Sequence, residues 1–244
     1  MNTLHQPRFA FIFRLSFLLL LGFHLTCIRE GLTIGRMISK SLLLPLLLVY
    51  LVLALGKTGI QQITARWAIA ALFFSWCGDL LLMGEGTQVF LLGMIGFMLT
   101  HVCNRRFLLL VQPLRMSVNT IMGLAVAMLA VGIFYYVVKD QLGSFLMPVV
   151  IYMLLIAVSW ILSFNLLNHR DNIKKTAPLF IVGIGLFILS DAVLAYNKFF
   201  QLSNVLLELL VMVTYGIAQL TITEGYLNTF KNGTTELVEQ SINH

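Results

Sequence analysis

Charged residues are scarce in this sequence. Only 11% of its 244 residues are Asp, Glu, Lys or Arg, and 59% are hydrophobic, whereas soluble domains average about 25% charged residues. So few charges cannot cover the surface of a water-soluble globule. The same composition excludes a disordered chain, a coiled coil and a collagen-like chain. The sequence therefore predicts a polytopic membrane protein, whose apolar runs are long enough to cross a bilayer.

Cysteine and metal-ligand patterns are also scarce. Cys27, Cys77 and Cys103 are odd in number and lie in apolar runs, which favours small buried side chains over a disulfide or a metal site. His101 has no His or Cys partner at metal-ligand spacing, and no glycine-rich phosphate loop occurs. We expect no metal, no cofactor and no protein partner. Nucleic acid is not an expected partner either, because the basic residues are spread over connecting loops.

Apolar stretches bounded by charged and turn residues recur along the whole chain. They predict an all-α fold, a bundle of eight transmembrane helices at about 11–28, 41–56, 67–83, 88–111, 117–138, 146–164, 177–197 and 203–225. These helices make one transmembrane domain, 1–230, followed by a polar C-terminal tail, 231–244, that we expect to be loose. No A-x-A-like cleavage site follows the first run, so we interpret it as a membrane helix and not as a signal peptide.

The positions of Lys and Arg predict the orientation in the membrane. With eight spans both termini lie on one side, and that side holds eleven basic residues against five on the other. The eleven are Arg8, Arg14, Lys57, Arg66, Arg105, Arg106, Arg115, Arg170, Lys174, Lys175 and Lys231, and the five are Arg29, Arg36, Lys40, Lys139 and Lys198. Basic residues are enriched in cytoplasmic loops, so we expect cytoplasmic termini. A bacterial inner membrane is favoured, with the endoplasmic reticulum as the location in a eukaryote.

Two aspartates fall inside predicted membrane helices, where an ionisable side chain costs several kcal/mol unless it meets a partner or water. Asp79 lies 13 residues after Arg66, and Asp191 lies 13 residues after Pro178. At about 1.5 Å of rise per residue, both lie at a similar depth on the non-cytoplasmic side of the midplane. Two carboxyl groups at one depth predict one site. The alternative is that each aspartate only ties helices together by hydrogen bonds.

Further polar residues follow the same helices. In the stretch 88–111, one face carries Phe90, Gly93, Phe97, His101 and Asn104, and in 203–225 one face carries Glu208, Met212, Tyr215 and Gln219. Glu208 and Glu224 lie near the ends of 203–225, where snorkelling to the interface accounts for them. We expect a polar pocket closed off by Phe and Leu. Its candidate lining residues are Lys40, Ser75, Tyr152, Ser190, Asn197, Lys198, Tyr215 and Gln219.

The ordered motifs resemble the YhhN-like lysoplasmalogenase family of integral membrane proteins. They are Ser75-x-x-Gly78-Asp79, Phe90-x-x-Gly93-x-x-x-Phe97-x-x-x-His101, Leu189-Ser190-Asp191-x-x-Leu194-x-x-x-Lys198-Phe199 and Tyr215-x-x-x-Gln219. The resemblance covers about 40–225 and implies an eight-helix bundle that hydrolyses the vinyl ether bond of lysoplasmalogens to a fatty aldehyde and glycerophosphoethanolamine or glycerophosphocholine. The family aspartates match Asp79 and Asp191, and the family histidine matches His101. Two positions differ from the family: Asn104 stands where a Tyr is frequent, and Lys40-Ser41 stands where a Lys-Pro pair is frequent.

This chemistry needs a positioned acid, because hydrolysis begins with protonation of the alkene carbon distal to oxygen. Two neighbouring carboxyl groups in an apolar setting cannot easily both ionise, so one stays protonated while the other stabilises the oxocarbenium ion and orients water. We expect Asp79 and Asp191 to form this pair, with the roles between them open. His101 would relay a proton or orient water, and Lys40 and Lys198 would hold the phosphate of a lysophospholipid. Tyr152 or Tyr215 would face its ammonium group.

Three other functions would also use polar residues inside membrane helices. An intramembrane aspartyl protease needs Gly where Trp76 stands, and a Tyr-Asp pair that does not occur. A proton-coupled transporter would use buried Asp and His residues to relay protons, but the eight spans contain no inverted repeat. A non-catalytic lipid-binding protein is the third. Release of aldehyde in detergent without a gradient separates a hydrolase from all three.

Overall fold

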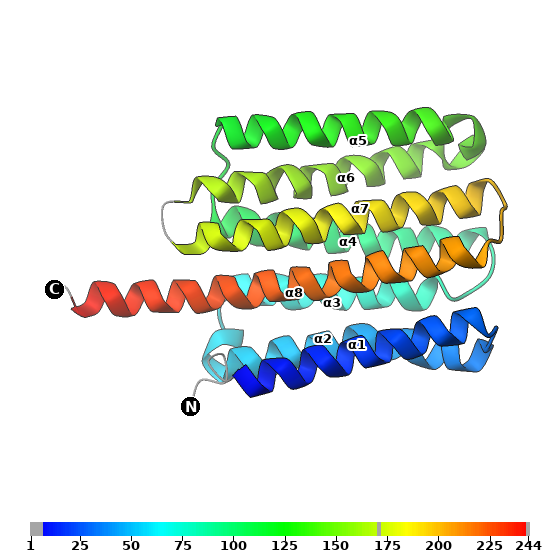
Figure 1. Cartoon of the computed structure of the whole chain (residues 1–244). Coiled ribbons are helices and arrows are strands. Elements are labelled where there is room, and N and C mark those ends of the chain that lie inside the picture. Colours follow the sequence, from blue (N-terminus) through cyan, green and yellow to red (C-terminus); the bar gives the residue numbers. More distant parts are fainter. Residues whose placement is uncertain (1–6, 170–171, 243–244) are drawn as a thin grey trace.

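The computed structural model describes residues 7–169 and 172–242. This part of the chain folds into eight α-helices and three short 3₁₀ helices and contains no β-strand, which confirms the all-α class. The α-helices are α1 (Pro7–Arg29), α2 (Thr33–Ile60), α3 (Ile63–Leu81), α4 (Thr87–Val111), α5 (Val118–Leu142), α6 (Leu146–Asn165), α7 (Ala177–Phe199) and α8 (Val205–Ile242). They lie side by side in an elongated bundle, in which α1 begins and α8 ends at the same end (Figure 1).

The neighbours of each helix set the position of the aspartates. α3 packs along α4 and α7 along α8, while α1 lies against α2 and α8, and α5 lies mainly against α6. Two glycines bring α3 and α4 close together, because a Cβ added to Gly96 would come within 2.9 Å of the backbone of Gly78. A side chain at either position would push the helices apart. The last turns of α3, which carry Asp79, therefore lie directly against α4.

Six helical segments of the described chain are long and apolar enough to cross a membrane. They are Pro7–Arg29, Thr33–Lys57, Thr87–Val111, Val118–Asn168, Asn172–Phe199 and Val205–Gly233. The segment Val118–Asn168 contains both α5 and α6, and α3, which carries Arg66 and Asp79, is not among the six. The prediction of a multi-pass membrane protein is thus confirmed, but eight separate crossings are not established by these segments.

Two predicted boundaries were wrong. α2 begins at Thr33 and not at 41, so Arg36 and Lys40 belong to a helix and not to a loop. Both side chains form ion pairs with acidic residues of other helices, so their charges are compensated within the bundle and the helix can include them. The polar tail was expected to be loose, but α8 continues to Ile242, and Asn232 donates a hydrogen bond to the carbonyl of Asn172. Residues 243 and 244 lie outside the described chain.

The end of the helical run in α2 matches the prediction. Gly56 has a φ of 63° and breaks the helical geometry inside α2. A side chain rarely adopts this backbone conformation, whereas glycine adopts it freely. The membrane-length part of α2 therefore ends where the sequence indicated, and the last residues of the helix turn toward α3.

Candidate active site

Asp79 lies in the last turn of α3 and is almost completely buried, with 2% of its surface exposed. The Nζ atom of Lys40, from α2, lies 3.6 Å from its Oδ1 atom. The hydroxyl of Tyr215, from α8, donates a hydrogen bond to its Oδ2 atom at 2.6 Å. A cation and a hydroxyl donor both favour the charged form of a carboxyl group. These two contacts oppose the cost of burying a charge at Asp79, a compensation that a buried carboxyl group without a cation lacks.

A chain of hydrogen bonds continues behind Tyr215. The Nε2 atom of Gln219 donates to the hydroxyl of Ser75 at 2.6 Å, and that hydroxyl lies 3.0 Å from the hydroxyl of Tyr215. Because the only hydroxyl proton of Tyr215 points to Asp79, the proton between Ser75 and Tyr215 comes from Ser75. All donors then point in one direction, and such chains strengthen each member by polarisation. The chain ends on Asp79 and adds to the support of its negative charge.

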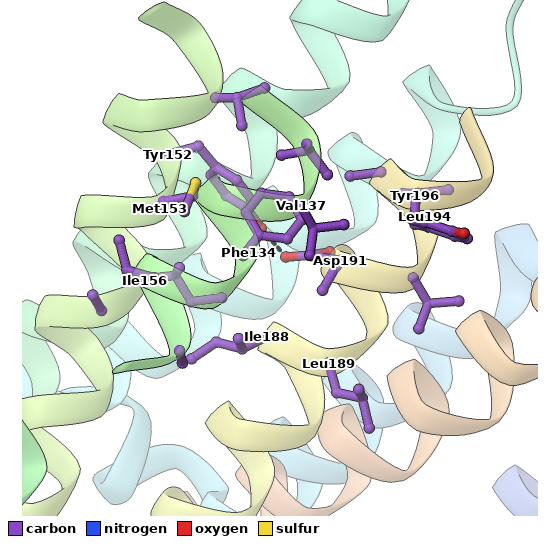
Figure 2. A pocket seen from close by; sticks show the side chains of 18 of the residues that line it. Phe134, Val137, Tyr152, Met153, Ile156, Ile188, Leu189, Asp191, Leu194 and Tyr196 are labelled. Atoms are coloured by element: carbon purple, nitrogen blue, oxygen red, sulfur yellow. Dashed lines mark hydrogen bonds between the residues drawn. The ribbon is translucent and has the colours of Figure 1, made fainter. Parts of the chain in front are cut away.

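Asp191 has different surroundings. It lies in α7 and is partly buried, and the hydroxyl of Tyr152 from α6 donates a short hydrogen bond to its Oδ2 atom. No Lys, Arg or His of the described chain forms an ion pair with it. Figure 2 shows Asp191 surrounded mainly by apolar side chains, among them Phe134 and Val137 of α5. This environment favours the protonated form of a carboxyl group, because burial penalises the charge without a compensating cation.

Two hollows meet at Asp191. We call the first the polar pocket. Its volume is about 380 Å³, and its polar lining residues are His24, Thr33, Arg36, Lys40, Asp79, Ser190, Asp191, Asn197, Lys198, Glu208 and Tyr215. The second, the apolar cavity, has a volume of about 450 Å³ and is lined chiefly by Ala, Val, Leu, Ile, Met and Phe of α4, α5, α6 and α7. Both volumes fall within the range of about 300–1,000 Å³ found for ligand sites.

The two hollows share part of their walls. Leu82, Phe90, Phe97, Asp191 and Leu194 line both of them. Asp79 lines only the polar pocket, and Tyr152 lines only the apolar cavity. The carboxyl group of Asp191 therefore stands where a long apolar chain in one hollow would join a polar group in the other. The similar depth predicted for the two aspartates is consistent with their common pocket.

The polar pocket carries charges of both signs at its outer part. Arg36 of α2 and Glu208 of α8 form an ion pair with an Nη2 to Oε2 distance of 2.7 Å. The Nζ atom of Lys198 lies 4.2 Å from the centre of the Phe90 ring, in a cation–π contact. Asn197 also lines this pocket, and its side-chain oxygen accepts a hydrogen bond from the amide of Asn204. The pocket thus offers hydrogen-bonding and charged groups to a polar ligand.

Three of the predicted residues lie one layer behind the two hollows. Ser75 and Gln219 line neither of them and instead hold the hydroxyl of Tyr215. His101 is fully buried and also lines neither hollow. Its ring packs against Phe187 and Tyr152, at 4.9 Å and 5.9 Å between ring centres. Its two ring nitrogens have no hydrogen-bond partner within the described chain.

The other predicted residues have direct partners. The hydroxyl of Ser190 lines the polar pocket and donates to the backbone carbonyl of Val211, which ties α7 to α8. Tyr152 or Tyr215 was predicted to face an ammonium group, which stays a prediction; the hydroxyl of each donates a hydrogen bond to an aspartate. Their place in the site is beside the carboxyl groups, where they orient them.

Several polar groups were missed or misread from the sequence. Snorkelling was wrong for Glu224, because it is 9% exposed and accepts hydrogen bonds from Arg14 at 2.6 and 2.5 Å and from Tyr50 at 3.0 Å. Arg14 lies inside an apolar run with no acidic residue near it in the sequence, and this was the signal that an acid from another helix must face it. His24 of α1 also lines the polar pocket, with its Nδ1 atom 2.7 Å from the hydroxyl of Ser39.

The described residues contain no group of three or more His, Cys, Asp or Glu side chains that could hold a metal ion. The polar side chains of the polar pocket carry carboxyl, hydroxyl, ammonium, guanidinium, carboxamide and imidazole groups. Such a set can donate and accept protons and can bind an ion of either sign.

Comparison with known proteins gives one match. The model of the YhhN family matches residues 35–226, a span that contains both aspartates, His101, Lys40 and Glu208. No curated protein and no solved structure matches the chain. The matched residues begin after α1, so His24 comes from outside the matched span. Since the match covers most of the chain, the resemblance found in the motifs is confirmed: the protein belongs to the YhhN family.

Proposed function

We propose that this protein is a lysoplasmalogenase, a membrane enzyme that hydrolyses the vinyl ether bond of a lysoplasmalogen. One observation carries the proposal: two carboxyl groups with different surroundings, one buried and one partly buried, line one polar pocket, and the partly buried one, Asp191, also lines a large apolar cavity. A single-chain lipid has the same division into an apolar chain and a polar headgroup. Membership of the YhhN family supports the reaction class.

In the proposed reaction, the carboxylic acid of Asp191 gives its proton to the alkene carbon distal to the ether oxygen. The carbon next to the oxygen becomes part of an oxocarbenium ion. Water adds to that carbon and loses a proton to a carboxylate, which forms a hemiacetal. The hemiacetal then breaks its bond to the glycerol oxygen, which takes up a proton, and releases a fatty aldehyde. The overall reaction consumes one water and yields the fatty aldehyde and glycerophosphoethanolamine or glycerophosphocholine.

The surroundings of the two aspartates support this division of roles. Lys40 and the hydroxyl of Tyr215 both contact Asp79, so Asp79 is the better candidate for the carboxylate that stabilises the cation and orients water. Asp191 has the Tyr152 hydroxyl on its Oδ2 atom, and its Oδ1 atom remains to carry the acidic proton. Its position at the apolar cavity also suits an acid, because the alkenyl chain would end beside it.

The same geometry suggests where the rest of the lipid lies. The alkenyl chain would occupy the apolar cavity between α5 and α7 and enter sideways from the bilayer. The glycerol and phosphate would occupy the polar pocket, within reach of Lys40 and Lys198. His101 contacts Tyr152 and not either carboxyl group, so we assign it a positioning role that acts through Tyr152.

We also propose that all eight helices cross the membrane, with both termini in the cytoplasm. The first residues of α1 and the last of α8 lie at one end of the bundle (Figure 1), as an even number of crossings requires. The eleven basic residues predicted on that side support a cytoplasmic location. Cysteine labelling at position 29 and at position 57 from either side of sealed vesicles tests this orientation.

The reaction is tested with purified protein in detergent and a lysoplasmalogen, with free aldehyde as the readout. We expect aldehyde release without any gradient and none from the matching alkyl ether, which lacks the double bond. The Asp79→Asn/Asp191→Asn double variant should release no aldehyde above the rate without protein. Absence of aldehyde from correctly folded wild-type protein would overturn the proposal and leave transport or lipid binding as the function to test.

A further inference from the structure

We propose that Arg36 and Glu208 recognise the headgroup of the lipid and select a zwitterionic phospho-alkylammonium group over a purely anionic one. Arg36 would bind the phosphate and Glu208 the ammonium. The inference rests on the proposed function for its choice of lipid, and it adds the residues that decide which headgroup is bound.

Two helices carry this order in parallel. On α2, Arg36 and Lys40 are one turn apart, about 6 Å along the axis, and both line the polar pocket. On α8, Glu208 and Tyr215 are two turns apart and line the same pocket. The inner member of each pair, Lys40 or Tyr215, contacts Asp79. The outer members, Arg36 and Glu208, contact each other.

The pocket therefore presents Lys40 beside Asp79 at its inner end and the contacting pair of Arg36 and Glu208 at its outer end. A lysophospholipid with its vinyl ether at Asp191 would place the phosphate next, near the cations, and the ammonium last. A two-carbon arm separates that phosphate from that ammonium.

The Arg36–Glu208 pair is built in a way that allows exchange. Their side chains are 41% and 33% exposed, and such a solvent-accessible pair contributes little to stability. A zwitterion can replace this one pair by two, phosphate with Arg36 and ammonium with Glu208. A phosphoglycerol headgroup would take Arg36 but would leave Glu208 without a cation, which costs binding energy.

The alternative is that the pair only ties α2 to α8. Binding of saturated alkyl-ether lysolipids separates the two, because these lipids bind without reacting. Two probes with the same chain, one with a phosphoethanolamine and one with a phosphoglycerol headgroup, are titrated into the purified protein, and Kd is measured by intrinsic tryptophan fluorescence. We expect wild-type protein to bind the phosphoethanolamine probe more tightly.

In the Glu208→Gln variant, we expect the Kd for the phosphoethanolamine probe to rise about tenfold, the effect of losing one charge-assisted hydrogen bond. The Kd for the phosphoglycerol probe should change less than twofold or fall. Glu30→Gln is the matched control, since Glu30 is an exposed acid that pairs with Arg29 and lines neither hollow. Equal changes for both probes would overturn the inference.

A charge exchange gives the second test. The Arg36→Glu/Glu208→Arg variant restores an ion pair between α2 and α8, so its Tm should be closer to the wild-type value than the Tm of Arg36→Glu or Glu208→Arg alone. The positions of the two charges are exchanged, however. We expect the preference for phosphoethanolamine to be lost. A restored preference would show that the pair is only a tie and would overturn the inference. Selective binding without aldehyde release from a lysoplasmalogen would instead overturn the proposed function and retain the headgroup recognition.

Discussion

The two aspartates of the site are the same residue in two different environments. Asp79 lies among α2, α3 and α8, next to Lys40 and at the end of the hydrogen-bond chain from Gln219. Asp191 lies between α6 and α7, with the Tyr152 hydroxyl and the apolar cavity beside it. Asp79 thus has a cation beside it that Asp191 lacks, and only Asp191 borders the apolar cavity. In the proposed reaction, these different surroundings give the same residue type two different roles.

The largest expected effect is the loss of turnover when either aspartate is changed. Asp79→Asn and Asp191→Asn should each lower aldehyde release at least about 10²-fold, as removal of a general acid or base does. Steady-state aldehyde assays on purified variants measure this loss. Asp140→Asn is the control, because Asp140 is an exposed residue in the last turn of α5. Near-normal turnover in both site variants would remove the proposed acid–base pair.

The next effect tests the apolar side of the comparison. Ala157 of α6 lines the apolar cavity, so Ala157→Phe would fill part of it. We expect kcat/KM for a long-chain lysoplasmalogen to fall about tenfold, because the ring would take space that the alkenyl chain needs, while a short-chain substrate is little affected. Ala125→Phe on the exposed face of α5 is the control. A loss that does not depend on chain length would mean that the chain does not lie in this cavity.

The stability of the two aspartate variants gives a smaller and independent difference. Asp79→Asn leaves the ammonium of Lys40 without its acidic partner, so we expect a loss of stability on the order of 1 kcal/mol. Adding Lys40→Met should recover it. Asp191→Asn leaves no cation unpaired and should change Tm less. Thermal denaturation in detergent measures both variants, and equal shifts in Tm would contradict the difference that we describe.

The smallest expected effect on activity lies outside both hollows. Glu224→Gln weakens the contacts with Arg14 and Tyr50 that join α8 to α1 and α2. We expect a loss of stability of about 1–3 kcal/mol, with turnover per folded molecule within about twofold of wild type. Tm and aldehyde release measured on the same preparation check this. A drop in turnover as large as that of the Asp79→Asn variant would show that the site extends to this end of the bundle.

Much of the fold could be predicted because the signals were local. Apolar runs predicted helices close to those observed, and Gly56 ended the helical run of α2 where expected. The start of α2 could not be predicted in this way. Arg36 and Lys40 interrupt the apolar run, and only their acidic partners explain why the helix includes them. Those partners, Glu208 and Asp79, lie far away in the sequence.

In the site, too, local features could be predicted and contacts between helices could not. Scarcity of charge made Asp79 and Asp191 visible in the sequence, and their spacing predicted one depth. Spacing could not show that Ser75 and Gln219 support Tyr215, or that Tyr152 and Tyr215 donate to carboxyl groups. Each of these contacts joins two helices, and the apolar pattern of a single helix does not determine how that helix is rotated against its neighbour.

Hydropathy and residue order are properties of single segments, so they are enough to predict an all-helical membrane protein of the YhhN family with two aspartates inside the bundle. Which aspartate meets Lys40 and which meets the apolar cavity depends on how the helices pack. Packing also brings Arg36 to Glu208. The physical reason is that charge and solvation depend on neighbours, and packing between helices brings those neighbours together.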